Sequence, residues 1–168
     1  MRLRTFVTLA IAGLVAGVVT AALAFAPTSV TQTGGLHFVG QPDVTATKTD
    51  TSATLTATGE VAGAGTSATA VLSADVAVTT GCINRGSKDQ QPSGLQRTTT
   101  TTSGSKTFQT RSGRGTFEVT TAPVGTAGRT CPDQMTPVLV STEFTNVTLT
   151  ITSGSSKTLT ATFPDIDP

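Results

Sequence analysis

Few side chains in this sequence could act as catalysts, and its single histidine is the first to consider. An imidazole base could come only from His37, and imidazole is the side chain best suited to proton transfer near neutral pH. His37 could form a triad with Asp43 and one of the many serines. Nothing supports such a triad, because the G-x-S-x-G turn is missing and hydroxyl residues occur throughout the chain. We therefore expect His37, beside Phe38 in a strand-like segment, to be a packing or surface residue.

Acidic residues could also perform chemistry if two of them met across a substrate. Glu60, Glu118 and Glu143 could supply the acid and base of a glycosidase. Each lies in strand-like or turn sequence, where a solvated carboxylate is the usual state. Asp165 and Asp167 could attract calcium, but two carboxylates without a ligand loop are a weak signal. We therefore assign no catalytic residue, no metal site and no cofactor, and we expect a protein that is not an enzyme.

Cys82 and Cys131 are the only cysteines of the chain. A redox pair is usually spaced as C-x-x-C, and a metal site needs more ligands than two thiols and one histidine. We therefore predict a structural disulfide between them, as is common in exported domains. Closing a loop of about 50 residues would stabilise the domain by about 4 kcal/mol in the chain-entropy view.

The N-terminal segment has the pattern of an export signal. Arg2 and Arg4 precede an uncharged, largely apolar stretch over residues 5–26 that ends in small residues. This order is typical of a Sec-type signal peptide. We predict a signal peptide over residues 1–24, with cleavage after Ala24 preferred to cleavage after Ala26, and hence a secreted protein. The alternative is an uncleaved membrane anchor, since the apolar stretch is long enough to span a bilayer.

The rest of the sequence alternates between apolar and polar residues with the period of a β-strand. The even positions from 68 to 78 are all Ala, Leu or Val, and most of the odd ones are polar. The same alternation recurs in residues 53–58, 116–120, 147–152 and 159–163.

About seven to nine short strands separated by turn-forming residues predict an all-β fold. We expect an antiparallel Greek-key, immunoglobulin-like β-sandwich with one disulfide. It would form a single domain over residues 36–168, preceded by a flexible lead-in over residues 25–35.

One segment carries two conflicting phases of alternation. Val138, Val140 and Phe144 occupy even positions, whereas the apolar residues of 147–151 occupy odd ones. A β-bulge inserts one residue and reverses the phase of a strand. We therefore predict a bulge or bend within residues 141–146.

Two polar segments interrupt the strands and are the best candidates for binding loops. Residues 81–97 follow the first cysteine, and residues 122–137 contain the second. The disulfide would hold the two segments, or the adjacent strand ends, together. The alternative is that both are solvated surface loops. The side chains that we single out for binding are Asn84, Arg85, Lys88, Arg97, Arg129 and Asp133.

Threonine is the most unusual feature of the composition, with 38 residues, five of them consecutive at positions 98–102. This run could carry O-linked sugars, but the absence of mucin-like proline favours an exposed strand near a sheet edge. Such an edge could pair with a neighbouring chain. Residues 146–148 (NVT) form a glycosylation sequon, which matters only in a secretory pathway that reads it.

Several short segments carry a resemblance to known exported proteins. They are residues 36–39 (LHFV), 55–65 (LTATGEVAGAG), 82–86 (CINRG), 131–132 (CP) and 144–149 (FTNVTL), together with the alternating strand between the second and third. In these segments the chain resembles a loose group of small exported proteins of actinobacteria and haloarchaea. The resemblance implies an exported β-sandwich with one disulfide and brings no activity with it. Members of the group often have a longer Gly- and Pro-rich insert where this chain has GSKDQQPSG.

Charge and composition exclude several classes of function. Charged residues make up only 12% of the chain, against about a quarter in ordinary domains. Without the signal peptide, nine basic residues (11 − 2) face ten acidic ones. This near-neutrality argues against a nucleic-acid partner, and we expect membrane contact only through an uncleaved signal segment. The chain also lacks Trp and Tyr, on which sugar-binding faces depend.

The sequence therefore predicts an exported, non-enzymatic β-sandwich module with a binding, surface or structural role. Its partner would be an extracellular protein or a surface component. The alternative is a secreted protease inhibitor that presents the loop near Cys131, and a hydrolase is less favoured.

Overall fold

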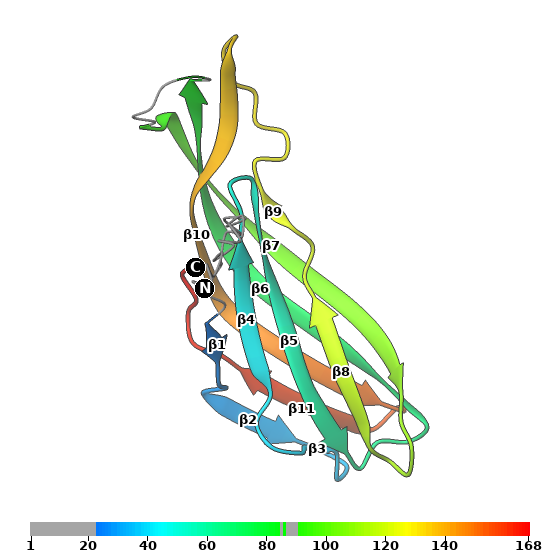
Figure 1. Cartoon of the computed structure of the whole chain (residues 1–168). Helices are drawn as coiled ribbons and strands as arrows, with labels where there is room; N and C mark the ends of the chain where they lie inside the picture. The colour runs from blue at the N-terminus through cyan, green and yellow to red at the C-terminus, as the bar shows by residue number, and fades with distance from the viewer. Residues whose placement is uncertain (1–22, 85, 87–90) are drawn as a thin grey trace, which may run out of the picture.

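The computed structural model describes residues 23–84, 86 and 91–168, and every regular element in these residues is a β-strand. Most of the expected signal peptide lies outside the described residues. The strands form two antiparallel sheets (Figure 1), which confirms the predicted β-sandwich. The finer Greek-key and immunoglobulin-like assignment remains a prediction.

The first sheet is built around one long central strand, β5 (Ser52–Ala62). On one side β5 pairs with β4 (Asp43–Lys48) and the short β3 (His37–Phe38), and β1 (Ala24–Phe25) extends the sheet beyond β4. On the other side β5 pairs with β8 (Gly115–Thr120) and the short β9 (Val124–Gly125).

The second sheet has the order β2-β11-β10-β6-β7. Its longest strands are β10 (Met135–Ser153), β6 (Ser67–Asn84) and β7 (Ser93–Gln109), and the shorter ones are β11 (Lys157–Thr162) and β2 (Ser29–Gln32). In this sheet β7 pairs with β6 alone, so one long side of β7 is a sheet edge.

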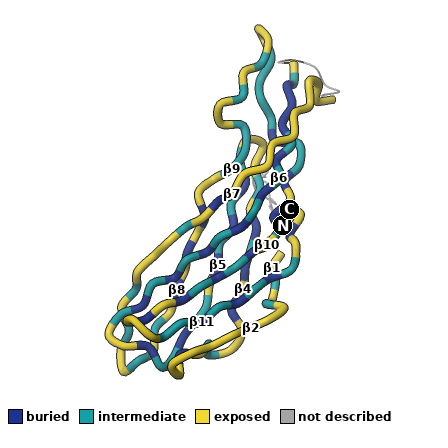
Figure 2. The backbone as a smooth tube through the Cα atoms, turned by 180° about the vertical axis from the view of Figure 1, so that it is seen from behind, coloured by how far each residue is buried: buried dark blue, intermediate teal, exposed yellow. Residues whose placement is uncertain are grey.

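The hydrophobic core lies between the two sheets, and alternation determines which residues enter it. The even positions of β6 from 68 to 82 are buried, as the sequence predicts, and they face the odd positions of β5, among them Leu55. Phe144 is the largest fully buried side chain. In Figure 2 buried and intermediate residues alternate along β6, whereas most of β7 is exposed.

Two irregularities in β10 resolve its conflicting phases. Asn146 has a positive φ of 52° and lies between Phe144 and Val147, which are both buried, so the bulge predicted for residues 141–146 is confirmed. A second shift of pairing occurs between Leu139 and Ser141. It was not predicted, and because of it Leu139, rather than Val138 or Val140, is the buried residue.

The segment expected to be a flexible lead-in contains ordered strands instead. Residues 29–32 form β2, which pairs with β11 at the edge of the second sheet. The backbone N–H groups of Thr28 and Thr33 also donate to the carbonyls of Thr162 and Thr158. Phe25 pairs with Val44 and packs against the core. Backbone pairing therefore fixes a segment whose side chains are mostly exposed. For this reason the segment has no apolar alternation from which a strand could be predicted.

The ends of β6, β7 and β10 project beyond the sandwich at the top of Figure 1. We call this extension the arm and define it as residues 80–84, 91–97 and 126–139. Strand pairing continues into it as far as Asn84 and Met135, so the predicted loop over residues 81–97 is shorter than expected. Cys82 and Cys131 form the predicted disulfide within the arm, with a Cα–Cα distance of 5.8 Å.

Candidate functional site

The residues considered for catalysis lie apart on open surfaces. His37 is exposed, and its Nδ1 lies 3.0 Å from the carbonyl oxygen of Gly35. Asp165 and Asp167 are exposed on either side of the buried Ile166. No group of three or more His, Cys, Asp or Glu residues that could hold a metal ion occurs in the described part of the chain.

The three glutamates do not form a glycosidase pair within a cleft. Glu60 and Glu118 occupy neighbouring strands on the outer face of the first sheet, and Glu60 is paired with Arg114 at 2.9 Å. Glu143 lies in the second sheet, where it is paired with Arg97 at 2.8 Å. None of the three lines the groove described below.

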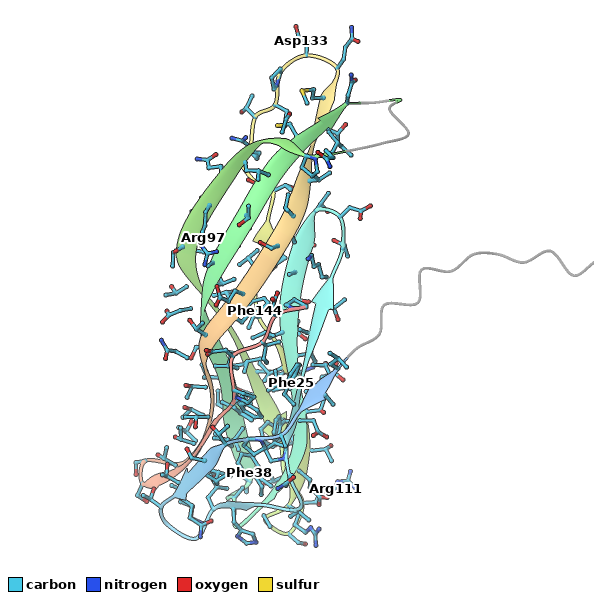
Figure 3. All side chains as sticks on the ribbon, turned by 90° about the vertical axis from the view of Figure 1, so that its left-hand side faces the viewer. Phe25, Phe38, Arg97, Arg111, Asp133 and Phe144 are labelled. Carbon is cyan, nitrogen blue, oxygen red and sulfur yellow. A yellow bond between two sulfur atoms is a disulfide. The ribbon has the colours of Figure 1, made fainter. Side chains whose placement is uncertain are left out.

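The side chains singled out for binding do not form one site. Arg97 points to the outer face of the second sheet, whereas Arg129 reaches toward its inner face. Asn84 is exposed at the end of β6. In Figure 3, Asp133 marks the tip of the arm, far above Arg97 on the flank of β7. Of the remaining candidates, Arg85 and Lys88 lie outside the described residues.

One pocket of the described structure is a groove between β7 and the segment that follows β8. It has a volume of about 640 Å³, within the range of small-molecule and peptide sites. We call it the β7–β9 groove. Its walls are formed by residues of β6 (Val78, Thr80), of β7 (Gln96, Thr98, Thr100 to Ser103) and of the opposite segment (Ala122 to Gly125 and Ala127 to Arg129).

Threonines of β7 form one wall of the groove because of the register between β6 and β7. Thr98 pairs with Val78 and Thr100 with Val76, and directly paired residues point to the same face of a sheet. Both valines are buried, so the two threonines occupy positions that would normally belong to the core. They are nevertheless exposed, because the first sheet does not extend over them.

At its lower end the groove is closed where β7 contacts the segment after β8. The hydroxyl of Thr102 donates to the carbonyl of Ala122 at 2.8 Å, and the Ala122 N–H donates to the Ser103 carbonyl at 3.0 Å. Gly104 permits this approach, since a Cβ there would lie 1.9 Å from the carbonyl oxygen of Thr120. The two sheets are thus joined directly below the groove.

At its upper end the groove is closed by Arg129. Its guanidinium donates to Gln96 Oε1 at 2.6 Å and to the carbonyl of Gly94. The disulfide to Cys82 holds the same loop two residues further along the chain, at Cys131. The side chain of Arg129 therefore fixes the loop to β7, and the disulfide fixes it to the neighbouring β6.

Within the described part of the chain, the edge of β7 between these two ends presents unpaired backbone groups. The N–H of Thr110 donates to Thr66 beside β6, whereas the carbonyl of Ser103 accepts a bond from outside the sheet. In an antiparallel strand successive residues direct their backbone groups to opposite sides. Arg97, Thr99 and Thr101, with the parity of Ser103, therefore direct their N–H and C=O groups away from β6.

The opposite wall does not complete the sheet. Pro123 has no N–H to donate, and Val124 and Gly125 pair with β5 instead. Thr126 also donates its N–H to Thr51, on the side of β5. The groove is therefore a gap between a free strand edge and a segment that belongs to the other sheet.

The groove is nearly uncharged. Among the described residues, Arg129 is the only ionisable one that lines it, and its guanidinium has no carboxylate partner there. Its Nε atom is buried and has no hydrogen-bond partner in the described structure. The upper end of the groove is thus positive, and the rest offers hydroxyl, amide and short apolar groups.

Sequence reasoning selected Arg129 but not the residues that form the groove with it. Gln96, Thr98 and Thr100 face inward only because of the pairing between β6 and β7. A run of identical threonines has no alternation from which a face could be assigned. The groove could therefore not be predicted from the sequence, because its prediction requires the register between β6 and β7.

Comparisons of the chain with protein-family models, with curated proteins and with solved structures found no match. The similarity to exported proteins of actinobacteria and haloarchaea thus remains a prediction. In the residues that the structure describes, no helix is long and apolar enough to cross a bilayer.

Proposed function

We propose that this chain is an exported, non-enzymatic recognition module that binds an extracellular partner in the β7–β9 groove. The observation that carries the proposal is the construction of the groove, which is open along a strand edge yet fixed at both ends. The Ser103–Ala122 contact fixes one end, and Arg129 with the disulfide fixes the other. A preformed groove loses little entropy when it binds a ligand.

Export is the second part of the proposal. A disulfide is typical of oxidising compartments outside the cytosol, and the structure contains one. We propose a Sec-type signal peptide cleaved after Ala24. The position of Phe25 supports this choice, because cleavage after Ala26 would remove this side chain from the core it packs against. Cleavage after Ala24 removes only exposed residues from the described part of the chain.

A protease inhibitor is less favoured by the geometry of the loop near Cys131. Inhibition of a trypsin-like protease would require a free basic side chain that can enter the protease pocket. Arg129 is the basic residue of this loop, and Gln96 and Gly94 hold its guanidinium. The recognition module is therefore the better account.

The test is a comparison of two tryptophan variants that differ only in the face of β7 they alter. Thr100→Trp should fill the groove, whereas Thr99→Trp places the same side chain on the outer face, where Thr99 does not line the groove. Each purified protein would be immobilised and exposed to the medium and cell envelope of the producing organism. We expect a ligand that the wild type and Thr99→Trp retain and that Thr100→Trp loses by at least tenfold.

Two results would contradict the proposal. The first is equal retention by Thr99→Trp and Thr100→Trp, which would place binding elsewhere. The second is turnover of a substrate by the wild-type protein, which would show an enzyme.

A further inference from the structure

We propose that the ligand of the β7–β9 groove is a single extended peptide that adds to the edge of β7. The peptide runs antiparallel to β7 and carries an acidic residue at its C-terminal end, beside Arg129. This inference rests on the proposed function and names the class of partner.

The backbone of β7 offers hydrogen-bonding groups to an added strand. Arg97, Thr99 and Thr101 direct N–H and C=O groups away from β6, and in the described structure Thr101 accepts only a long bond of 3.5 Å from Thr100 Oγ1. A row of such groups is a template for an added strand. From Gln96 to Thr102 the edge is about 20 Å long at 3.3 Å per residue, which suits a peptide of about six residues.

The side chains lining the groove define what the peptide would carry. Residues of an added strand opposite Thr98 and Thr100 would point into the groove, because side chains alternate between the two faces of a sheet. There they would meet Val78 and Val124. Small or β-branched side chains suit these inward positions, whereas the outward positions face solvent and are less restricted.

The charge of the groove sets the end at which an antiparallel peptide carries its acidic residue. Arg129 lies against Gly94 and Gln96, at the N-terminal end of β7. The C-terminal end of an antiparallel strand lies at that same end. Since the guanidinium has no carboxylate partner among the described residues, an acidic residue there complements the charge and bonds with Arg129.

The closed ends of the groove favour an isolated peptide over a second copy of this chain. The Ser103–Ala122 contact and the Arg129–Gln96 contact join β7 to the opposite wall on both sides of the gap. A β7 strand from another molecule would bring its own sheet and its own opposite wall to this gap. A single strand needs only the space between the two ends.

The experiment begins with selection of peptides from a random heptapeptide phage library on the disulfide-bonded protein. Selected peptides would then be synthesised and N-methylated at one position at a time. N-methylation removes an N–H donor without changing the side chain. We expect a loss of at least tenfold in affinity at alternate positions, those whose N–H faces β7, and less than twofold at the positions between them.

Matched variants of the protein test where the peptide lies. Thr99→Pro removes an outward N–H within the groove, and Ser105→Pro removes one of the same parity beyond the Ser103–Ala122 contact. We expect Thr99→Pro to lower affinity at least tenfold and Ser105→Pro to leave it within twofold. If Thr99→Pro does not fold, the N-methylation pattern decides the question alone.

A charge cycle tests the contact between the acidic residue of the peptide and Arg129. Replacing that acidic residue by the corresponding amide should lower the affinity of the wild type about fivefold and leave that of Arg129→Gln unchanged. An equal loss with both proteins would overturn the assigned contact with Arg129.

The remaining outcomes separate this inference from the proposed function. No selected peptide, or affinity that is insensitive to N-methylation and to Thr99→Pro, would overturn the peptide inference. The proposed function would survive that result if Thr100→Trp still abolished capture of the natural ligand. If Thr100→Trp had no effect in that assay, the groove itself would be wrong as the binding site.

Discussion

At the scale of single residues, threonine performs different tasks according to where it lies. Thr121 is buried, and its hydroxyl accepts the backbone N–H of Leu55 at 3.1 Å. Thr142 is fully buried, but its hydroxyl has no partner in the described structure. A buried polar group without a partner costs about 1–3 kcal/mol, whereas a bonded one contributes to stability.

We therefore expect opposite effects from the same substitution at these two positions. Thr142→Val should raise the free energy of unfolding by about 1 kcal/mol, because valine has nearly the same shape and nothing to desolvate. Thr121→Val should lower it by about 1–2 kcal/mol, since it leaves the Leu55 N–H without an acceptor. Urea unfolding of both variants measures this, and a loss of stability in Thr142→Val would show that its hydroxyl is bonded.

At the scale of elements, the relation between β6 and β7 determines the groove. The alternation of β6 predicted which of its residues are buried, because a long period-two pattern has one apolar face. In β10, a change in the phase of the same kind of alternation predicted the bulge at Asn146. The register of β7 could not be predicted in this way, since residues 98–102 are identical. The bond from Arg129 to Gln96 likewise joins residues that are 33 positions apart.

The lower end of the groove should depend on the absence of a side chain at Gly104. An added Cβ would lie 1.9 Å from the Thr120 carbonyl oxygen and 2.6 Å from its carbon, so the backbones of β7 and β8 would have to separate. We expect Gly104→Ala to destabilise the fold by about 2–3 kcal/mol, in the range of overpacking in a rigid site. In Gly65→Ala the nearest atom would be Ser153 Oγ at 3.5 Å, so this control should change stability by less than about 1 kcal/mol. Equal thermal melting of the two variants would contradict the close contact at Gly104.

At the scale of the whole molecule, the disulfide stabilises the arm and is also the structural feature that supports export. Cys82 and Cys131 are 49 positions apart, so their bond restricts a large part of the unfolded chain. In the chain-entropy model this amounts to about 4 kcal/mol. The bond lies in the arm, and because Cys131 is two residues from Arg129, it also holds the loop that closes the groove.

The export that we propose predicts a defined intact mass for the protein recovered from the medium. We expect the mass of residues 25–168 less two hydrogens, with a gain of two hydrogens after reduction. Removing both cysteines by alanine substitution should lower the free energy of unfolding by about 4 kcal/mol. A mass that includes residues 1–24, from a protein recovered only in membranes, would indicate a tethered domain and contradict cleavage. Added hexose would show that the threonines carry sugars.

The most direct measurement is amide hydrogen exchange along β7 in the free protein, followed residue by residue by NMR. The account depends on an open edge, in which the N–H groups of Thr99 and Thr101 face solvent and those of Thr98 and Thr100 bond to β6. It predicts fast exchange at Thr99 and Thr101 and slow exchange at Thr98 and Thr100, independent of protein concentration. Slow exchange at all four amides would contradict the account, because it would show that another strand already occupies the edge.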